Sequence, residues 1–155
     1  MHLTLSAENF LAGLGWFPRG SGKERRLASA LLGELVAILR VIEEHGMEER
    51  LQARATGSED KLDIAGFSVP PVSVYQANVA HLDVFRPPLP RQIALLYTRL
   101  GALEPDLRAA AESGSLSGAR KVLGELRAIL EEADEVLRAL RPLVSRRRPR
   151  SISRA

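Results

Sequence analysis

The stretch LLGELVAILRVIEE (Leu31–Glu44) returns later in the chain as VLGELRAILEEADE (Val122–Glu135). Both stretches contain Leu-Gly-Glu-Leu, then Ala-Ile-Leu, and both end on Glu. Their apolar residues recur every three to four positions, which is the spacing of one face of an α-helix. The two stretches therefore predict two long amphipathic helices that frame an all-α bundle. Bundle helices drawn from Leu, Ala, Glu and Ile often look alike, so we favour convergence over duplication as the origin of the likeness.

Helical periodicity extends outward from both stretches and predicts a four-helix bundle in the order long, short, medium and long. Gly46 is expected to weaken the later turns of the first helix, and Pro105 to kink or split the third. Glu34 lies off the apolar stripe of the first helix. The predicted helices run from about Lys23 to Ala53, from about Ser73 to Phe85, from the proline cluster at 87–90 to the turn at 113–115, and from there to about Leu143, where Pro142 and Pro149 close the last one.

The bundle, residues 21–143, is flanked by two segments of different character. Residues 1–20 form an amphipathic segment whose apolar side chains follow helical spacing and continue into an aromatic pair. Because so short a helix is marginal alone, we expect it to pack on another surface. Residues 144–155 form a basic tail, which its composition predicts to be disordered. The candidate interaction residues of the first segment are Phe10, Leu14, Trp16 and Phe17.

The net charge of +3 hides an uneven distribution of charge. The whole chain has 22 basic and 19 acidic residues, and without the five arginines of the tail 17 basic residues remain. The high pI of about 9.8 is therefore a property of the tail. A second basic group precedes the first long helix and includes Arg19 and Lys23. The candidate anion-binding residues are Arg25 and Arg26 of this group and Arg146, Arg147, Arg148 and Arg150 of the tail.

Composition excludes several classes of chemistry. The 155-residue chain has no cysteine, which rules out disulfides, thiol catalysis and thiolate metal sites. No pair of Glu-x-x-His motifs faces the interior, so no metal site of the di-iron bundle type is predicted. A Gly-x-Ser-x-Gly nucleophile motif is absent as well. We therefore predict no metal site, no other cofactor and no catalytic residue. No apolar run approaches the roughly 20 residues that span a bilayer, and the start lacks the basic region of a secretory signal. We expect a cytoplasmic protein, with a peripheral membrane position left open.

Arg40 and His45 have the one spacing that suggests an enzyme. They resemble the motif of an Arg, four to six residues and a His in HEPN-family ribonucleases, which are helical bundles. The resemblance implies that the Arg stabilises charge at a phosphate and that the His acts in acid–base chemistry. Val41 stands where that family usually has a polar residue. Two positions five apart also fall on different sides of a continuous helix, so we favour a solvated pair and keep the ribonuclease as an alternative.

Tyr75, Asn78 and Tyr97 lie on the apolar stripes of the short and medium helices. Asn78 is expected to share a buried face with Tyr75, so we predict structural hydrogen bonds that fix the helix register. The pattern of these residues around the proline break resembles a region of a family of small bacterial helical proteins of uncharacterised function, over residues 27–107. The resemblance implies a long leading helix, an aromatic-rich short helix, a loop and a helix that carries Tyr, and it brings no activity.

An up-down-up-down order would bring the start of the first long helix and the end of the last one to the same end of the bundle. The two basic groups would then form a basic pole, with the apolar segment 1–20 beside it. The sequence therefore predicts a non-enzymatic helical interaction module that docks a protein partner or an anionic surface, such as a membrane, through the basic pole. The alternatives are the HEPN-like ribonuclease and nucleic-acid binding through the Arg-rich tail. Assembly into a homo-oligomer is left open.

Overall fold

The computed structural model of the protein describes residues 22–145. Within that range every element is helical and there is no strand, so the predicted all-α class is confirmed. Our predictions for the amino-terminal segment and for the basic tail lie outside the described residues. The elements are α2 (Gly22–Glu44), α3 (Met47–Thr56), α4 (Ser73–Asn78), the 3-10 helix η1 (Val79–Val84), α5 (Leu89–Ser113) and α6 (Leu116–Ser145).

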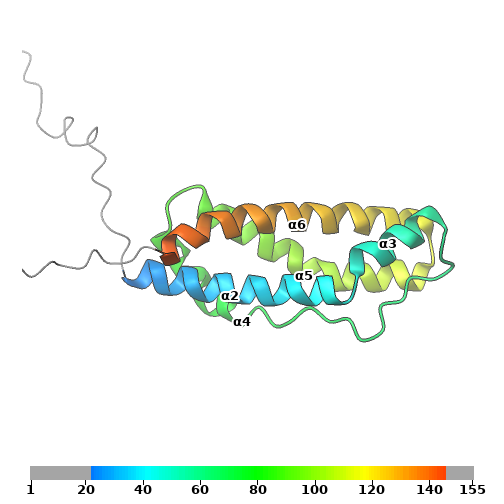
Figure 1. Ribbon diagram of the computed structural model, residues 1–155, viewed down its shortest axis with the longest axis horizontal. Coiled ribbons are helices and arrows are strands. Elements are labelled where there is room, and N and C mark those ends of the chain that lie inside the picture. Colours follow the sequence, from blue (N-terminus) through cyan, green and yellow to red (C-terminus); the bar gives the residue numbers. More distant parts are fainter. Residues whose placement is uncertain (1–21, 146–155) are drawn as a thin grey trace, which may run out of the picture.

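The long helices lie side by side along one axis (Figure 1). Helices α2 and α5 run in one direction and α6 returns in the other, packed against α2, α3 and α5. The linker of residues 57–72 brings the chain back along the bundle, and α4 and η1 then pack near the start of α2. The start of α2 and the end of α6 share one end of the molecule, and α5 begins there too.

The interior of the bundle is apolar, and no polar or charged side chain between Gly22 and Ser145 is fully buried. The two similar stretches bury the same positions. Leu35 and Ile38 of α2 are 0% exposed, while Leu126 and Ile129 of α6 are 0% and 1% exposed. The shared spacing of these leucines and isoleucines therefore forms the packing between α2 and α6.

The first long helix is not continuous to Ala53, and that prediction is wrong. Helix α2 ends at Glu44 and α3 begins at Met47. Between them Gly46 adopts a left-handed backbone with φ 56°, which glycine reaches without the steric cost of a Cβ atom. The change of direction brings Met47 and other apolar residues of α3 onto α6, where Met47 is completely buried.

Helix α5 continues through Pro105, so the split that was one of the two outcomes predicted there does not occur. A proline inside a helix costs about 3 kcal/mol. Leu103 and Leu107 on either side of the exposed Pro105 are buried, and each contributes about 1.5–3 kcal/mol. Helix α6 includes Pro142 and ends at Ser145, close to the predicted end at about Leu143.

The predicted short helix of residues 73–85 consists of two pieces with different winding. Helix α4 ends at Asn78, and η1 continues with the tighter three-residue turn of a 3-10 helix. This change of period turns Val79 outward, so that it is 49% exposed. Leu82 and Phe85 become the residues that anchor this segment in the core.

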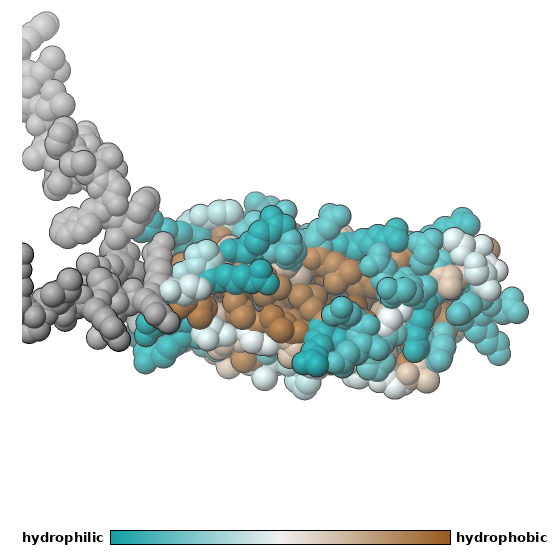
Figure 2. All heavy atoms as spheres, in the orientation of Figure 1, coloured by the Kyte–Doolittle hydropathy of each residue, from teal (hydrophilic) through white to brown (hydrophobic). Residues whose placement is uncertain are grey.

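Charged side chains cover most of the surface, and one face also carries apolar atoms, which gather over α2 and its seam with α6 (Figure 2). Helix α2 leaves Val36 44% exposed and Leu32 and Leu39 half-buried, and Leu130 of α6 is half-buried as well. None of the helices between Gly22 and Ser145 is both long enough and apolar enough to cross a membrane.

Replacing Leu35 or Leu126 by alanine tests the packing of the two long helices. Both side chains are completely buried, so each substitution is expected to lower the free energy of unfolding by about 2–5 kcal/mol. Denaturation in urea, followed by circular dichroism at 222 nm, measures the change. Losses below about half a kcal/mol for both variants would show that the two leucines are not core residues.

Candidate interaction site at the basic pole

The carboxylate of Glu34 joins three segments that are far apart in the sequence. Its Oε1 accepts the backbone N–H of Val74 at 2.7 Å, and its Oε2 accepts that of Tyr75 at 3.1 Å. These are N–H groups of the first turn of α4, which have no partner within a helix. The preceding residue, Val72, has no side-chain acceptor to cap them. Glu34 therefore caps α4 from a neighbouring helix, with its negative charge at the favourable end.

Tyr97 of α5 completes this arrangement. Its hydroxyl donates to Oε2 of Glu34 at 2.8 Å, and its ring stacks on that of Tyr75 with centroids 4.2 Å apart and planes 9° apart. Burial raises the pKa of the Tyr97 phenol, and the hydrogen bond to Glu34 and the charge of that carboxylate raise it further. The phenol stays neutral and remains a donor. The three hydrogen bonds to Glu34 and the stack of the two tyrosine rings therefore link α2, α4 and α5.

The three polar residues make contacts that differ from those expected. Asn78 is half-buried and donates from Nδ2 to the Val74 carbonyl at 2.8 Å, within its own helix. Tyr75 acts through its ring and its backbone N–H, and Tyr97 binds Glu34. The sequence pattern missed Glu34 because it lies off the apolar stripe of α2. No local signal marks it, since its partners are 40 to 63 positions away.

The basic pole is the end of the molecule at which α2 begins, η1 leads into α5, and α6 ends. Residues 22–26, 79–92 and 134–145 contribute seven Lys and Arg against four Asp and Glu. The opposite end, residues 43–63 and 104–121, has six basic against ten acidic residues. The described part of the chain is therefore polarised along its long axis, and the arginine-rich residues 146–155 follow directly from the basic end.

Arginines at the basic pole also differ from the other described arginines in their partners. Arg25 and Arg26 of α2 and Arg91 of α5 are exposed and form no ion pair or hydrogen bond with another described residue, and the same holds for Lys23. Arg138 is paired with Asp134, which lowers the pKa of that carboxyl through the hydrogen bond. Every described arginine outside the pole binds a carboxylate, an amide or a backbone carbonyl, namely Arg40, Arg50, Arg54, Arg99, Arg108, Arg120 and Arg127.

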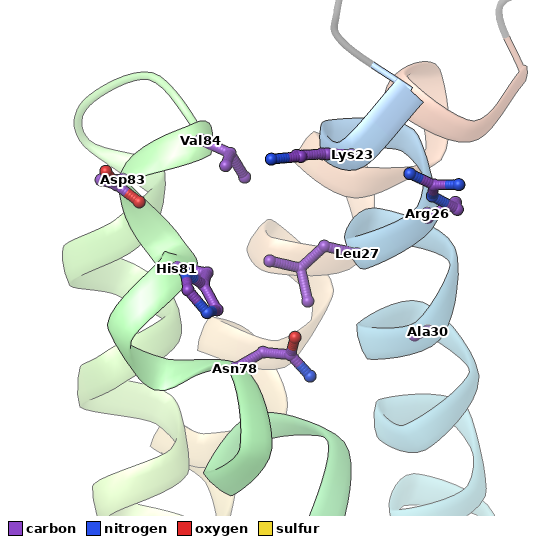
Figure 3. Close-up of a pocket in the computed structure, with 8 residues that line it drawn as sticks. All are labelled: Lys23, Arg26, Leu27, Ala30, Asn78, His81, Asp83 and Val84. Carbon is purple, nitrogen blue, oxygen red and sulfur yellow. The ribbon is translucent and has the colours of Figure 1, made fainter.

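A cleft of about 600 Å³ opens at the basic pole between α2 and the α4–η1 segment (Figure 3). Lys23 extends across it from α2, and His81 and Asn78 point into it from the opposite wall. Leu27 projects between the walls, while Asp83 lies at the outer edge of η1 in this view. The cleft is lined by Lys23, Arg26, Leu27, Ala30, Asn78, His81, Asp83 and Val84.

Arg40 and His45 do not converge. Arg40 pairs with Glu44 at 2.7 Å on the exposed face of α2. Both ring nitrogens of His45 face backbone carbonyls, that of Val41 at 2.9 Å and that of Gly66 at 3.1 Å. His45 thereby ties the end of α2 to the linker, and this placement gives no support to the ribonuclease alternative. No three His, Asp or Glu side chains among residues 22–145 are grouped to hold a metal ion.

Several predicted site residues lie outside the described part of the chain. Arg25 and Arg26 are placed at the basic pole, beside or in the cleft wall. The remaining candidates for apolar contact and anion binding are not among residues 22–145, namely Phe10, Leu14, Trp16, Phe17, Arg146, Arg147, Arg148 and Arg150.

Comparison of the chain with models of protein families, with curated proteins and with solved structures gives no match. The features that bear on function are therefore the charge distribution and the cleft at the basic pole.

Replacing Glu34 by glutamine tests the cap on α4. One amide oxygen cannot accept all three donors, and the new NH₂ group faces N–H groups, so the free energy of unfolding should fall by about 2 kcal/mol. Glu125→Gln is the matched control, because Glu125 holds the same place in the repeated stretch and forms only an exposed ion pair with Arg99. The control should lose less than about 1 kcal/mol. Equal losses in urea denaturation would contradict a special role for Glu34.

The raised pKa of Tyr97 predicts a loss of stability in alkali. The unfolded chain releases the phenolic proton near pH 10, whereas the folded protein retains it, so the unfolding free energy falls as pH rises above about 10. By about pH 11 the wild type should have lost about 1 kcal/mol more than Tyr97→Phe, relative to about pH 9. Denaturation of both proteins at the two pH values measures the difference, and parallel losses would refute the prediction.

Proposed function

We propose that the protein is a non-enzymatic helical module, a four-helix bundle in the order long, short, medium and long, that docks on an anionic surface through its basic pole. The observation that carries the proposal is that Arg25, Arg26 and Arg91 are exposed without a described partner, while all described arginines outside the pole are engaged. Unpaired arginines gathered at one end supply attraction to an anionic surface that paired arginines do not.

The sequence on either side of the described residues supports a membrane as that surface. Residues 1–20 combine apolar and aromatic residues at helical spacing, and they lead directly into the basic start of α2. Residues 146–155 add five arginines at the end of α6, which lies at the same pole. Apolar insertion together with several cations gives stable but reversible attachment, because either signal alone is weak. An acidic protein partner and nucleic acid are the competing outcomes of the test.

Sedimentation with lipid vesicles tests the proposal. The full chain should bind vesicles that contain phosphatidylserine, should bind less at high salt, and should not bind vesicles of phosphatidylcholine alone. A basic residue near such a surface contributes about 1 kcal/mol, so Arg25→Gln combined with Arg91→Gln should weaken binding roughly 30-fold. Deleting residues 146–155, beyond the end of α6, should weaken it further.

The matched control is Lys61→Gln combined with Lys121→Gln, which removes the same charge from the opposite end. These lysines also form no ion pair with another described residue. The control should bind vesicles as the wild type does. Equal weakening in the two double variants would show that net charge, not the pole, is responsible. Absence of vesicle binding at low salt would refute a membrane as the docking surface. A preference for RNA or DNA in the same assay would favour nucleic acid as the partner.

A further inference from the structure

The cleft at the basic pole presents polar groups that no described residue uses. Lys23 and His81 form no hydrogen bond with another residue of the described chain. Asn78 gives its amide nitrogen to the Val74 carbonyl, which leaves its Oδ1 atom without a described donor. All three side chains point into the same space from two walls (Figure 3). An ammonium group and an imidazole that line one cleft without a described acceptor are available to bind one.

Apolar side chains lie between these groups. Leu27 projects into the cleft, and Ala30 and Val84 contribute to its walls. The volume of about 600 Å³ is in the range of sites that enclose small organic ligands. A cleft of this kind holds a molecule whose polar end meets the hydrogen-bonding groups while its apolar part covers the leucine.

The charge of the cleft indicates the sign of the ligand. Lys23 and Arg26 contribute two positive charges, and Asp83, at the outer edge of the opposite wall, contributes one negative charge. With His81 neutral the lining is therefore positive by one charge. Charge-assisted hydrogen bonds from lysine and arginine favour phosphate and carboxylate oxygens. A phosphate adds the advantage of three oxygens, enough to reach donors on both walls.

We propose that the cleft binds the phosphomonoester of a single phosphatidic acid, with the adjoining glycerol carbons against Leu27 and Val84. The inference rests on the proposed function, since an anionic membrane that contains phosphatidic acid would present this ligand to the basic pole. The cleft would add a specific site to the general attraction of the pole. Lys23 and His81 donate to the phosphate, and Arg26 supplies long-range charge.

Titration with a monomeric short-chain lipid separates the cleft from surface attraction. The probe is dihexanoyl phosphatidic acid below its micelle concentration, added to the full chain labelled with ¹⁵N. Saturable shifts are expected in the backbone amides of Lys23, Leu27, Asn78 and His81 and not in those of α3. Dihexanoyl phosphatidylcholine and inorganic phosphate should each bind at least tenfold more weakly, because the first lacks the phosphomonoester charge and the second lacks the apolar body.

Matched variants assign the binding to the cleft. Lys23→Gln should lower the affinity for the short-chain lipid about tenfold. Arg25→Gln removes the same charge two positions along but lies outside the lining, so it should change this affinity less than about twofold. Ala30→Glu places a negative charge in the cleft and should abolish binding. Its control is Ala37→Glu, two turns further along the same exposed face of α2 and not part of the lining.

The outcomes distinguish this inference from the proposed function. If the protein binds vesicles but not the monomeric lipid, the proposed lipid site in the cleft is refuted and docking through the basic pole is still supported. Binding of the monomeric lipid without vesicle binding supports the cleft and overturns the membrane as the surface. Equal weakening by Lys23→Gln and Arg25→Gln, or equal affinity for inorganic phosphate, would each show that the cleft is not a headgroup site.

Discussion

The contact between the Glu34 carboxylate and α4 fixes the start of the α4–η1 segment against α2 and α5. Residues 57–72 have no regular helix or strand, and the six-residue α4 has no side-chain cap of its own. So short a helix does not persist in water without tertiary contacts. One carboxylate accepts two of its N–H groups and the Tyr97 hydroxyl together. The α4–η1 segment is thereby held against α2 and α5, and one wall of the cleft comes from this segment.

The parts of the fold that the sequence predicted are those in which local spacing and burial agree. Leu35 and Leu126 lie at the same place in two similar stretches, and both are buried as their period requires. The basic pole follows from helix order and the positions of charges along the chain, both of which a sequence displays. The break at Gly46 was predicted only as a weakening, because the packing of Met47 against α6 decides whether a glycine ends a helix.

The parts that could not be predicted depend on contacts between distant residues. Glu34 is an ordinary surface glutamate by its local pattern, and its three donors come from other segments. The cleft requires the change from α4 to the 3-10 winding of η1, which sets where His81 points. At Pro105 the predicted split does not occur, because the buried leucines on either side keep α5 continuous.

Dependence of α4 on a cap from another helix also affects how the native protein opens. Segments that are stabilised by few contacts unfold locally, without unfolding of the whole domain. The backbone amides of residues 73–84 are therefore expected to exchange with deuterium sooner than those of α6, whose core residues are buried along its whole length. Since Asn78 and His81 belong to this segment, the cleft wall that they form is expected to open with it, while the opposite wall belongs to the long, well-buried helix α2.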